Sequence, residues 1–89
     1  GGQCISCIDS NNQYLAGKKS YAKKLQEKAE LLAQFATAEA DPALTQADKE
    51  ELARSKAQLL DTFDKLSRTS KDMYEMALTV RDLACTVGI

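Results

Sequence analysis

The sequence predicts an all-α fold, an antiparallel hairpin of two helices that pack in the manner of a coiled coil. Ala, Leu, Lys, Glu, Gln and Asp dominate from Tyr14 onward, which is the composition of long helices. Apolar residues in both halves of the chain recur every three or four positions. The only proline, Pro42, lies near the midpoint, where a short connection makes two helices antiparallel neighbours.

The first helix is predicted over about residues 10–37. The polar run at residues 9–12 supplies several N-cap side chains, which accept hydrogen bonds from the first free backbone N–H groups. Residues 1–9 are expected to form an N-terminal arm that carries Cys4 and Cys7. A stripe with helical spacing comprises Tyr14, Tyr21, Leu25, Ala29, Leu32 and Phe35, with Ala22 and Ala36 beside it.

The turn is predicted at Asp41 and Pro42. Proline lacks the N–H group that an internal helical bond needs, and its ring disfavours helical geometry at the preceding residue. The first helix should therefore end before Asp41. Thr45 is the expected N-cap of the next helix, with Asp48 three residues later in a variant of the capping box.

The second helix is predicted over about residues 45–87. Its apolar residues step by threes and fours for about five heptads. The expected seam comprises Leu52, Leu59, Phe63, Leu66, Met73, Ala77, Val80, Ala84 and Val87, with Lys56 and Ser70 as its polar positions. The whole chain, residues 1–89, then forms one helical-hairpin domain.

Several function classes are disfavoured. The chain has no histidine, which removes Ser-His-Asp and Cys-His nucleophile systems and the commonest zinc ligand. It has no glycine-rich phosphate loop, and its carboxylates are interleaved with Lys and Arg as on a solvated helix face. We therefore expect no enzyme, cofactor or metal site. The net charge of −1 gives no case for nucleic acid, and no apolar run is long enough to span a membrane.

The three cysteines leave alternatives open. Cys4 and Cys7 form a C-x-x-C spacing, but the redox motif of this type normally opens a helix beside a parallel sheet. An extended N-terminal arm would bring either Cys4 or Cys7 level with Cys85. The sequence therefore allows a disulfide between Cys85 and one of the two, with one thiol left over, or three reduced thiols.

A hairpin has a single mutual interface, and some apolar residues lie away from it. Leu60, Tyr74, Leu78 and Leu83 are off the predicted seam of the second helix, and Leu15 and Leu31 are off that of the first. Another copy of the chain or a partner helix would have to cover them.

Two short elements resemble a known family. The segment Asp-Pro-Ala-Leu at residues 41–44 and the segment Lys-Asp-Met at residues 71–73 are similar to the turn and the second helix of the needle subunits of bacterial type III secretion systems. The resemblance implies a subunit that is exported after a cytoplasmic stage with small helical chaperones, and that polymerises into a hollow tube at the cell surface. A needle chaperone is the neighbouring hypothesis. The interface residues expected on this basis are Leu60, Phe63, Leu66, Met73, Tyr74, Ala77, Leu78, Val80 and Leu83.

The leading hypothesis is a non-enzymatic structural or interaction protein. Its partner would be itself, as an oligomer or polymer, or another helical protein of a secretion system. The alternative is a stand-alone secreted helical module closed by a disulfide, acting as a toxin, effector or immunity-like ligand. A C-x-x-C redox protein is a third hypothesis.

Overall fold

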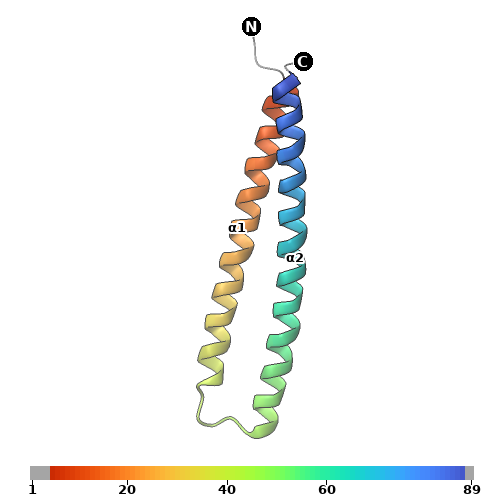
Figure 1. Cartoon of the computed structure of the whole chain (residues 1–89). Coiled ribbons are helices and arrows are strands. Elements are labelled where there is room, and N and C mark those ends of the chain that lie inside the picture. The colour runs from red at the N-terminus through yellow and green to blue at the C-terminus, as the bar shows by residue number, and fades with distance from the viewer. Residues whose placement is uncertain (1–4, 88–89) are drawn as a thin grey trace.

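The structure, a computed structural model, describes residues 5–87 and contains two long helices. Helix α1 spans Ile5–Glu39 and helix α2 spans Gln46–Val87. They run antiparallel and lie side by side along their length, with both termini at one end and the turn at the other (Figure 1). The molecule is a rod of 68 × 16 × 12 Å. The predicted all-α hairpin is confirmed.

Helix α1 begins earlier than the sequence predicted. Residues 5–9, expected in an arm, are already helical, and the polar run at 9–12 lies inside the helix rather than at its cap. Local support comes from Gln13, whose Nε2 donates to Asp9 Oδ2 at 3.2 Å. Contacts with α2 add to it, because Asn11 Oδ1 accepts a hydrogen bond from Arg81 at 3.2 Å. Packing against α2 therefore overrides the capping tendency of these residues.

The turn is where proline predicted it. The Asp41 N–H donates to the Ala38 carbonyl at 3.3 Å, which closes the end of α1 in a tight turn. Asp41 Oδ1 then accepts a hydrogen bond from the Ala43 N–H at 2.9 Å, and the Asp41 carbonyl accepts one from Leu44 at 3.3 Å. Pro42 thus occupies the second position of a β-turn, which its fixed φ favours.

The N-cap of α2 is also confirmed. The Asp48 N–H donates to Thr45 Oγ1, and the Thr45 N–H donates to Asp48 Oδ2, both at 3.1 Å. This reciprocal pair is a capping box with Asp in place of Glu. The hydrogen bonds from the Thr45 backbone and side chain lower the pKa of the Asp48 carboxyl below its ordinary value.

The seam between the helices follows a strict heptad and contains many polar residues. On α1 the inward residues are Cys7, Ser10, Tyr14, Gly17, Tyr21, Lys24, Lys28, Leu31, Phe35 and Ala38. On α2 they are Lys56, Leu60, Phe63, Ser67, Ser70, Tyr74, Ala77, Arg81 and Ala84. Among the described residues no hydrophobic side chain is fully buried; the buried residues are Ser10 and Ser67, each 8% exposed.

The inward face of each helix agrees only in part with the predicted one. Tyr14, Tyr21 and Phe35 of α1 face α2 as predicted. The same holds on α2 for the predicted seam positions Lys56, Phe63, Ser70, Ala77 and Ala84, which face α1. On α2 the predicted seam residues Leu59, Leu66, Met73 and Val80 are exposed, and the residues that follow them point inward instead. On α1, Leu25, Ala29 and Leu32 are exposed, whereas Leu31 is half-buried. The predicted spacing was correct, and part of each predicted face is inside. The rest is replaced by a neighbouring row, which corresponds to a partial rotation of each helix.

One register runs along the hairpin. Near the termini a disulfide joins Cys7 to Cys85, with their Cα atoms 4.7 Å apart. Four residues further along α1 and four residues back along α2, Arg81 bonds Asn11. Three heptads from the disulfide, Lys28 Nζ lies 2.7 Å from Asp64 Oδ1. The constant spacing of these contacts shows that no bulge or slip interrupts the pairing between the disulfide and the Lys28–Asp64 ion pair.

Candidate interaction surface

A row of uncharged residues runs along the outside of α2. We call it the α2 stripe, and it comprises Leu59, Thr62, Leu66, Thr69, Met73, Met76, Val80 and Leu83. All eight side chains are exposed, with Met73 at 67% and Met76 at 70%. Their spacing alternates between three and four residues, which places them in one row on the helix surface. Large apolar side chains in a continuous exposed row mark a surface that packs against another molecule.

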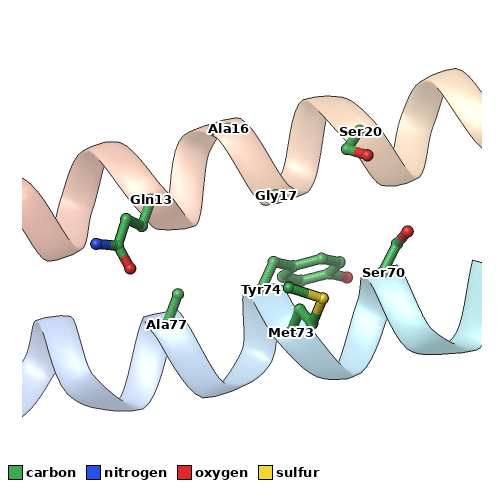
Figure 2. A pocket seen from close by; sticks show the side chains of 8 residues that line it. All are labelled: Gln13, Ala16, Gly17, Ser20, Ser70, Met73, Tyr74 and Ala77. Atoms are coloured by element: carbon green, nitrogen blue, oxygen red, sulfur yellow. The ribbon is translucent and has the colours of Figure 1, made fainter.

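The orientation of α2 is fixed by a close contact in the half of the hairpin that lies farther from the turn. Gly17 of α1 lies directly against Tyr74, so that a Cβ atom at Gly17 would be 2.6 Å from the Tyr74 Cβ (Figure 2). The Tyr74 ring lies between two rings of α1, at 6.0 Å from Tyr14 and 5.6 Å from Tyr21. Such aromatic contacts contribute beyond the area they bury. Because Tyr74 points inward, Met73 on its flank points out.

Arg81 holds the same end of the hairpin together. Its guanidinium lies 4.7 Å from the centre of the Tyr14 ring, within the range of a cation–π contact. It also donates to Asn11 of α1 and, on its own helix, to Asp82. The disulfide between Cys7 and Cys85 closes the chain one turn further on. These contacts fix the rotation of α2 and leave the α2 stripe pointing away from α1.

A shallow groove borders the α2 stripe on the side of α1. It has a volume of about 390 Å³ and is lined by Gln13, Ala16, Gly17, Ser20, Ser70, Met73, Tyr74 and Ala77. Figure 2 shows Gln13 directed toward α2 across the groove and Met73 beside the Tyr74 ring. Its α1 wall consists of small or polar residues. The apolar surface on this flank of the hairpin therefore belongs almost entirely to α2.

The opposite flank has a different character. There α1 exposes Ile8, Leu15, Leu25 and Leu32, but Asn11 and Lys18 interrupt this row. The neighbouring face of α2 is charged, and Asp64, Arg68 and Lys71 line a groove of about 310 Å³ beside Leu25. The Ser67 hydroxyl borders the same groove, where it is buried without a hydrogen-bond partner. This flank mixes charge and apolar residues, whereas the α2 stripe contains no charge from Leu59 to Leu83.

The structure divides the predicted interface residues into two groups. Leu60, Phe63, Tyr74, Ala77 and Leu78 are half-buried within the hairpin. The exposed group comprises Leu66, Met73, Val80 and Leu83, which all belong to the α2 stripe. Sequence reasoning missed Met76, which lies seven residues before Leu83 and three after Met73. This heptad spacing in the sequence is the signal that places Met76 in the same row as Met73 and Leu83.

The structure also shows where the cysteines and the possible metal ligands of the described residues lie. Cys7 is bonded to Cys85 and so is not free to pair with Cys4, which lies outside the described residues. Across residues 5–87 no group of three or more His, Cys, Asp or Glu side chains could hold a metal ion. Neither helix, over the same residues, is long and apolar enough to cross a membrane.

No protein-family model matches the sequence, and no curated protein or solved structure is significantly similar to it.

Proposed function

We propose that the chain is a non-enzymatic interaction protein whose hairpin is completed by helices of other molecules, either copies of itself or a different helical protein. The observation that carries the proposal is the α2 stripe, a continuous exposed row of uncharged residues from Leu59 to Leu83. A helix with apolar rows on two faces is typical of the interior of a bundle. In the isolated hairpin α1 covers only one of these two rows of α2.

The dimensions of the hairpin support this proposal. The chain exposes 6566 Å², whereas a compact monomer of 9.7 kDa exposes about 5,100 Å². Its radius of gyration is 20.0 Å, compared with about 12 Å for a compact domain of this length. The difference of roughly 1,400 Å² exceeds the about 800 Å² that one partner loses in a standard interface. Association would therefore bury surface that the rod exposes in excess of a compact monomer.

The polar composition of the seam also supports association with other helices. Ser10, Lys24, Lys28, Ser67 and Ser70 occupy positions that apolar residues fill in a stable coiled coil. A short chain with a polar seam gains little stability from its own core. Association through the exposed rows would add the missing apolar burial, at about 25 cal/mol per Å².

A type III secretion needle subunit is the particular assembly that the Asp-Pro-Ala-Leu turn suggests. The hairpin architecture and the turn at Asp41 and Pro42 support it. On this proposal the subunit is exported and assembles at the cell surface after a cytoplasmic stage. A needle chaperone would use the same hairpin to cover the helix of another subunit.

The test is the dependence of size and stability on concentration. We expect light scattering to show growth in mass across a hundredfold concentration range, and the Tm to rise with it, because association stabilises only the folded chain. The measurement is made without reductant, so that the disulfide stays closed. A monomer at every concentration with a constant Tm would contradict assembly of copies.

The alternative function is a stand-alone secreted module that acts as a toxin, effector or immunity-like ligand. The disulfide between Cys7 and Cys85 favours it, because it joins residues separated by 78 positions and closes nearly the whole chain. Disulfides of this kind persist in oxidising compartments. Intact mass after alkylation, combined with a monomeric state at high concentration, would support this function over assembly.

A further inference from the structure

We propose that the second molecule on the α2 stripe is another copy of this chain, and that two α2 helices pair antiparallel about a two-fold axis beside Lys71. This inference rests on the proposed function, that other helices complete the hairpin, and it names the partner and its orientation. The result is a four-helix assembly in which the two α2 helices form the central contact.

The spacing of the α2 stripe is nearly the same read in either direction. With the axis beside Lys71, each residue of the stripe meets another residue of the stripe. The four pairs are Leu59 with Leu83 of the second copy, Thr62 with Val80, Leu66 with Met76, and Thr69 with Met73. A two-fold contact requires such self-complementarity, because the same patch is used by both copies. The eight residues form a complete second seam with no charge in it.

The two threonines in the stripe can be buried without loss. The Thr62 hydroxyl donates to the Gln58 carbonyl at 3.0 Å, and the Thr69 hydroxyl donates to the Lys65 carbonyl at 3.0 Å. Both hydroxyl donors are therefore satisfied within their own helix. Such a residue adds no unpaired donor when it becomes covered.

The flank of the hairpin that faces the second copy is about as large as one side of a standard interface. In the proposed register residues 55–87 of one α2 overlap the same residues of the other, over a length of about 48 Å. With a hairpin width of 16 Å, the face covers roughly 770 Å² per copy. This is close to the about 800 Å² per partner of a standard interface. The α1 residues on this flank, such as Gln13 and Ser20, supply a polar rim.

A line of exposed residues flanks the α2 stripe on the side away from α1. It comprises Gln58, Lys65, Asp72, Thr79 and Thr86. The residues of this line that meet across the contact differ between an antiparallel and a parallel pair of α2 helices. In the antiparallel pair Asp72 meets Asp72 of the second copy, and Gln58 meets Thr86 of the second copy. In a parallel two-fold pair this line would lie on opposite sides of the contact in the two copies, so that neither Asp72 with Asp72 nor Gln58 with Thr86 would meet.

The test uses single cysteines at these positions in a Cys4→Ser background with the Cys7–Cys85 disulfide intact. A short bismaleimide, which reacts with free thiols alone, then links cysteines that lie close together. We expect Asp72→Cys to form a covalent dimer by itself, and Gln58→Cys and Thr86→Cys to form one only when mixed. Glu75→Cys, exposed on the charged flank of α2, is the matched control and should stay unlinked. Linking of Gln58→Cys to itself, or no linking of any pair, would overturn the proposal.

A second measurement separates this inference from the proposed function. The double variant Met73→Glu/Met76→Glu should raise the dimer Kd roughly 100-fold or more in sedimentation, because two negative charges from each copy would lie in the centre of the contact. Both side chains are exposed in the hairpin, so its helicity by circular dichroism should be unchanged. Undiminished association of this variant would overturn the α2 pairing and leave assembly through another face. A wild-type chain that stays monomeric would overturn both the pairing and self-assembly.

Discussion

Gly17 and Tyr74 are in direct backbone-to-side-chain contact, and this contact sets the distance between the helices. A Cβ atom at position 17 would lie 2.6 Å from the Tyr74 Cβ and 3.2 Å from its Cα (Figure 2). Neither atom can move without moving α2 itself. Glycine is therefore required here for space, and it allows the Tyr74 ring to settle between Tyr14 and Tyr21.

Gly17→Ala should destabilise the hairpin. Alanine gains about 1 kcal/mol in helix propensity over glycine, but forcing an extra methyl group against a fixed backbone costs about 1–3 kcal/mol or more. We expect the second effect to be larger, because the clash is with main-chain and Cβ atoms. Urea unfolding followed by circular dichroism measures the difference. Ser20→Ala, in the same groove, is the control and should change stability by less than about 0.5 kcal/mol; a Gly17→Ala chain more stable than wild type would contradict the close contact.

Cys7→Ser should lower stability strongly in oxidising buffer. The disulfide joins residues separated by 78 positions, and a loop of that length corresponds to about 4.5 kcal/mol in the chain-entropy model. Cys4→Ser should leave the free energy of unfolding unchanged, which distinguishes the two pairings that the sequence left open. Peptide mapping of the alkylated chain provides a direct check. A Cys4–Cys85 linkage in the map, or equal stability of the Cys7→Ser variant, would be incompatible with the pairing in the structure.

Ser67→Ala should make the hairpin more stable. Ser67 is 8% exposed, and its hydroxyl has no hydrogen-bond partner. A buried polar group without a partner costs about 1–3 kcal/mol, and alanine also has the higher helix propensity. We expect a gain of about 1 kcal/mol in the free energy of unfolding. Thr62→Ala removes an exposed hydroxyl that is bonded to a carbonyl, so it is the control for helix propensity alone and should gain only about 0.5 kcal/mol.

The architecture of this chain is predictable from local signals. Pro42 and the Thr45 cap determine where a helix ends or begins through interactions within a few residues. These local interactions do not depend on tertiary contacts. The turn and the start of α2 therefore agree with expectation. The start of α1 does not, because residues 5–9 are helical and are held against α2 by the disulfide between Cys7 and Cys85. A long-range contact leaves no local pattern in the sequence.

The rotation of α2 was predicted incorrectly for a related reason. The helix carries two overlapping heptad rows, one through Leu59, Leu66 and Met73 and one shifted by a single residue. Hydrophobic spacing favours the first row. The structure places the second row inside, because Tyr74 fits against Gly17 and Cys85 reaches Cys7. Periodicity identifies an apolar row but does not say which partner covers it.

The Thr45–Asp48 capping box should give the hairpin an acid-sensitive component of stability. Reciprocal hydrogen bonds hold the pKa of Asp48 below its ordinary value of 3.8. A lowered carboxyl pKa stabilises the folded chain above the ordinary value, and this contribution is lost as the pH falls through the lowered pKa. Asp48→Asn should therefore be less stable than wild type at pH 7, and the two curves should converge below about pH 3.8. Thr45→Ala should lower stability by about 1 kcal/mol at neutral pH.

The decisive measurement is the double variant Thr45→Ala/Asp48→Asn, followed by urea unfolding from pH 7 to pH 2. Both residues belong to one hydrogen-bonded unit, so their effects should be less than additive. Glu51→Gln removes a negative charge from the same end of α2 and is the control for a general charge effect at the helix N-terminus. If it reproduced the full pH dependence of Asp48→Asn, the helix dipole rather than the capping box would account for it. A constant difference between wild type and Asp48→Asn at all pH values would remove the pKa argument altogether, because a group that does not titrate differently in the two states gives no such slope.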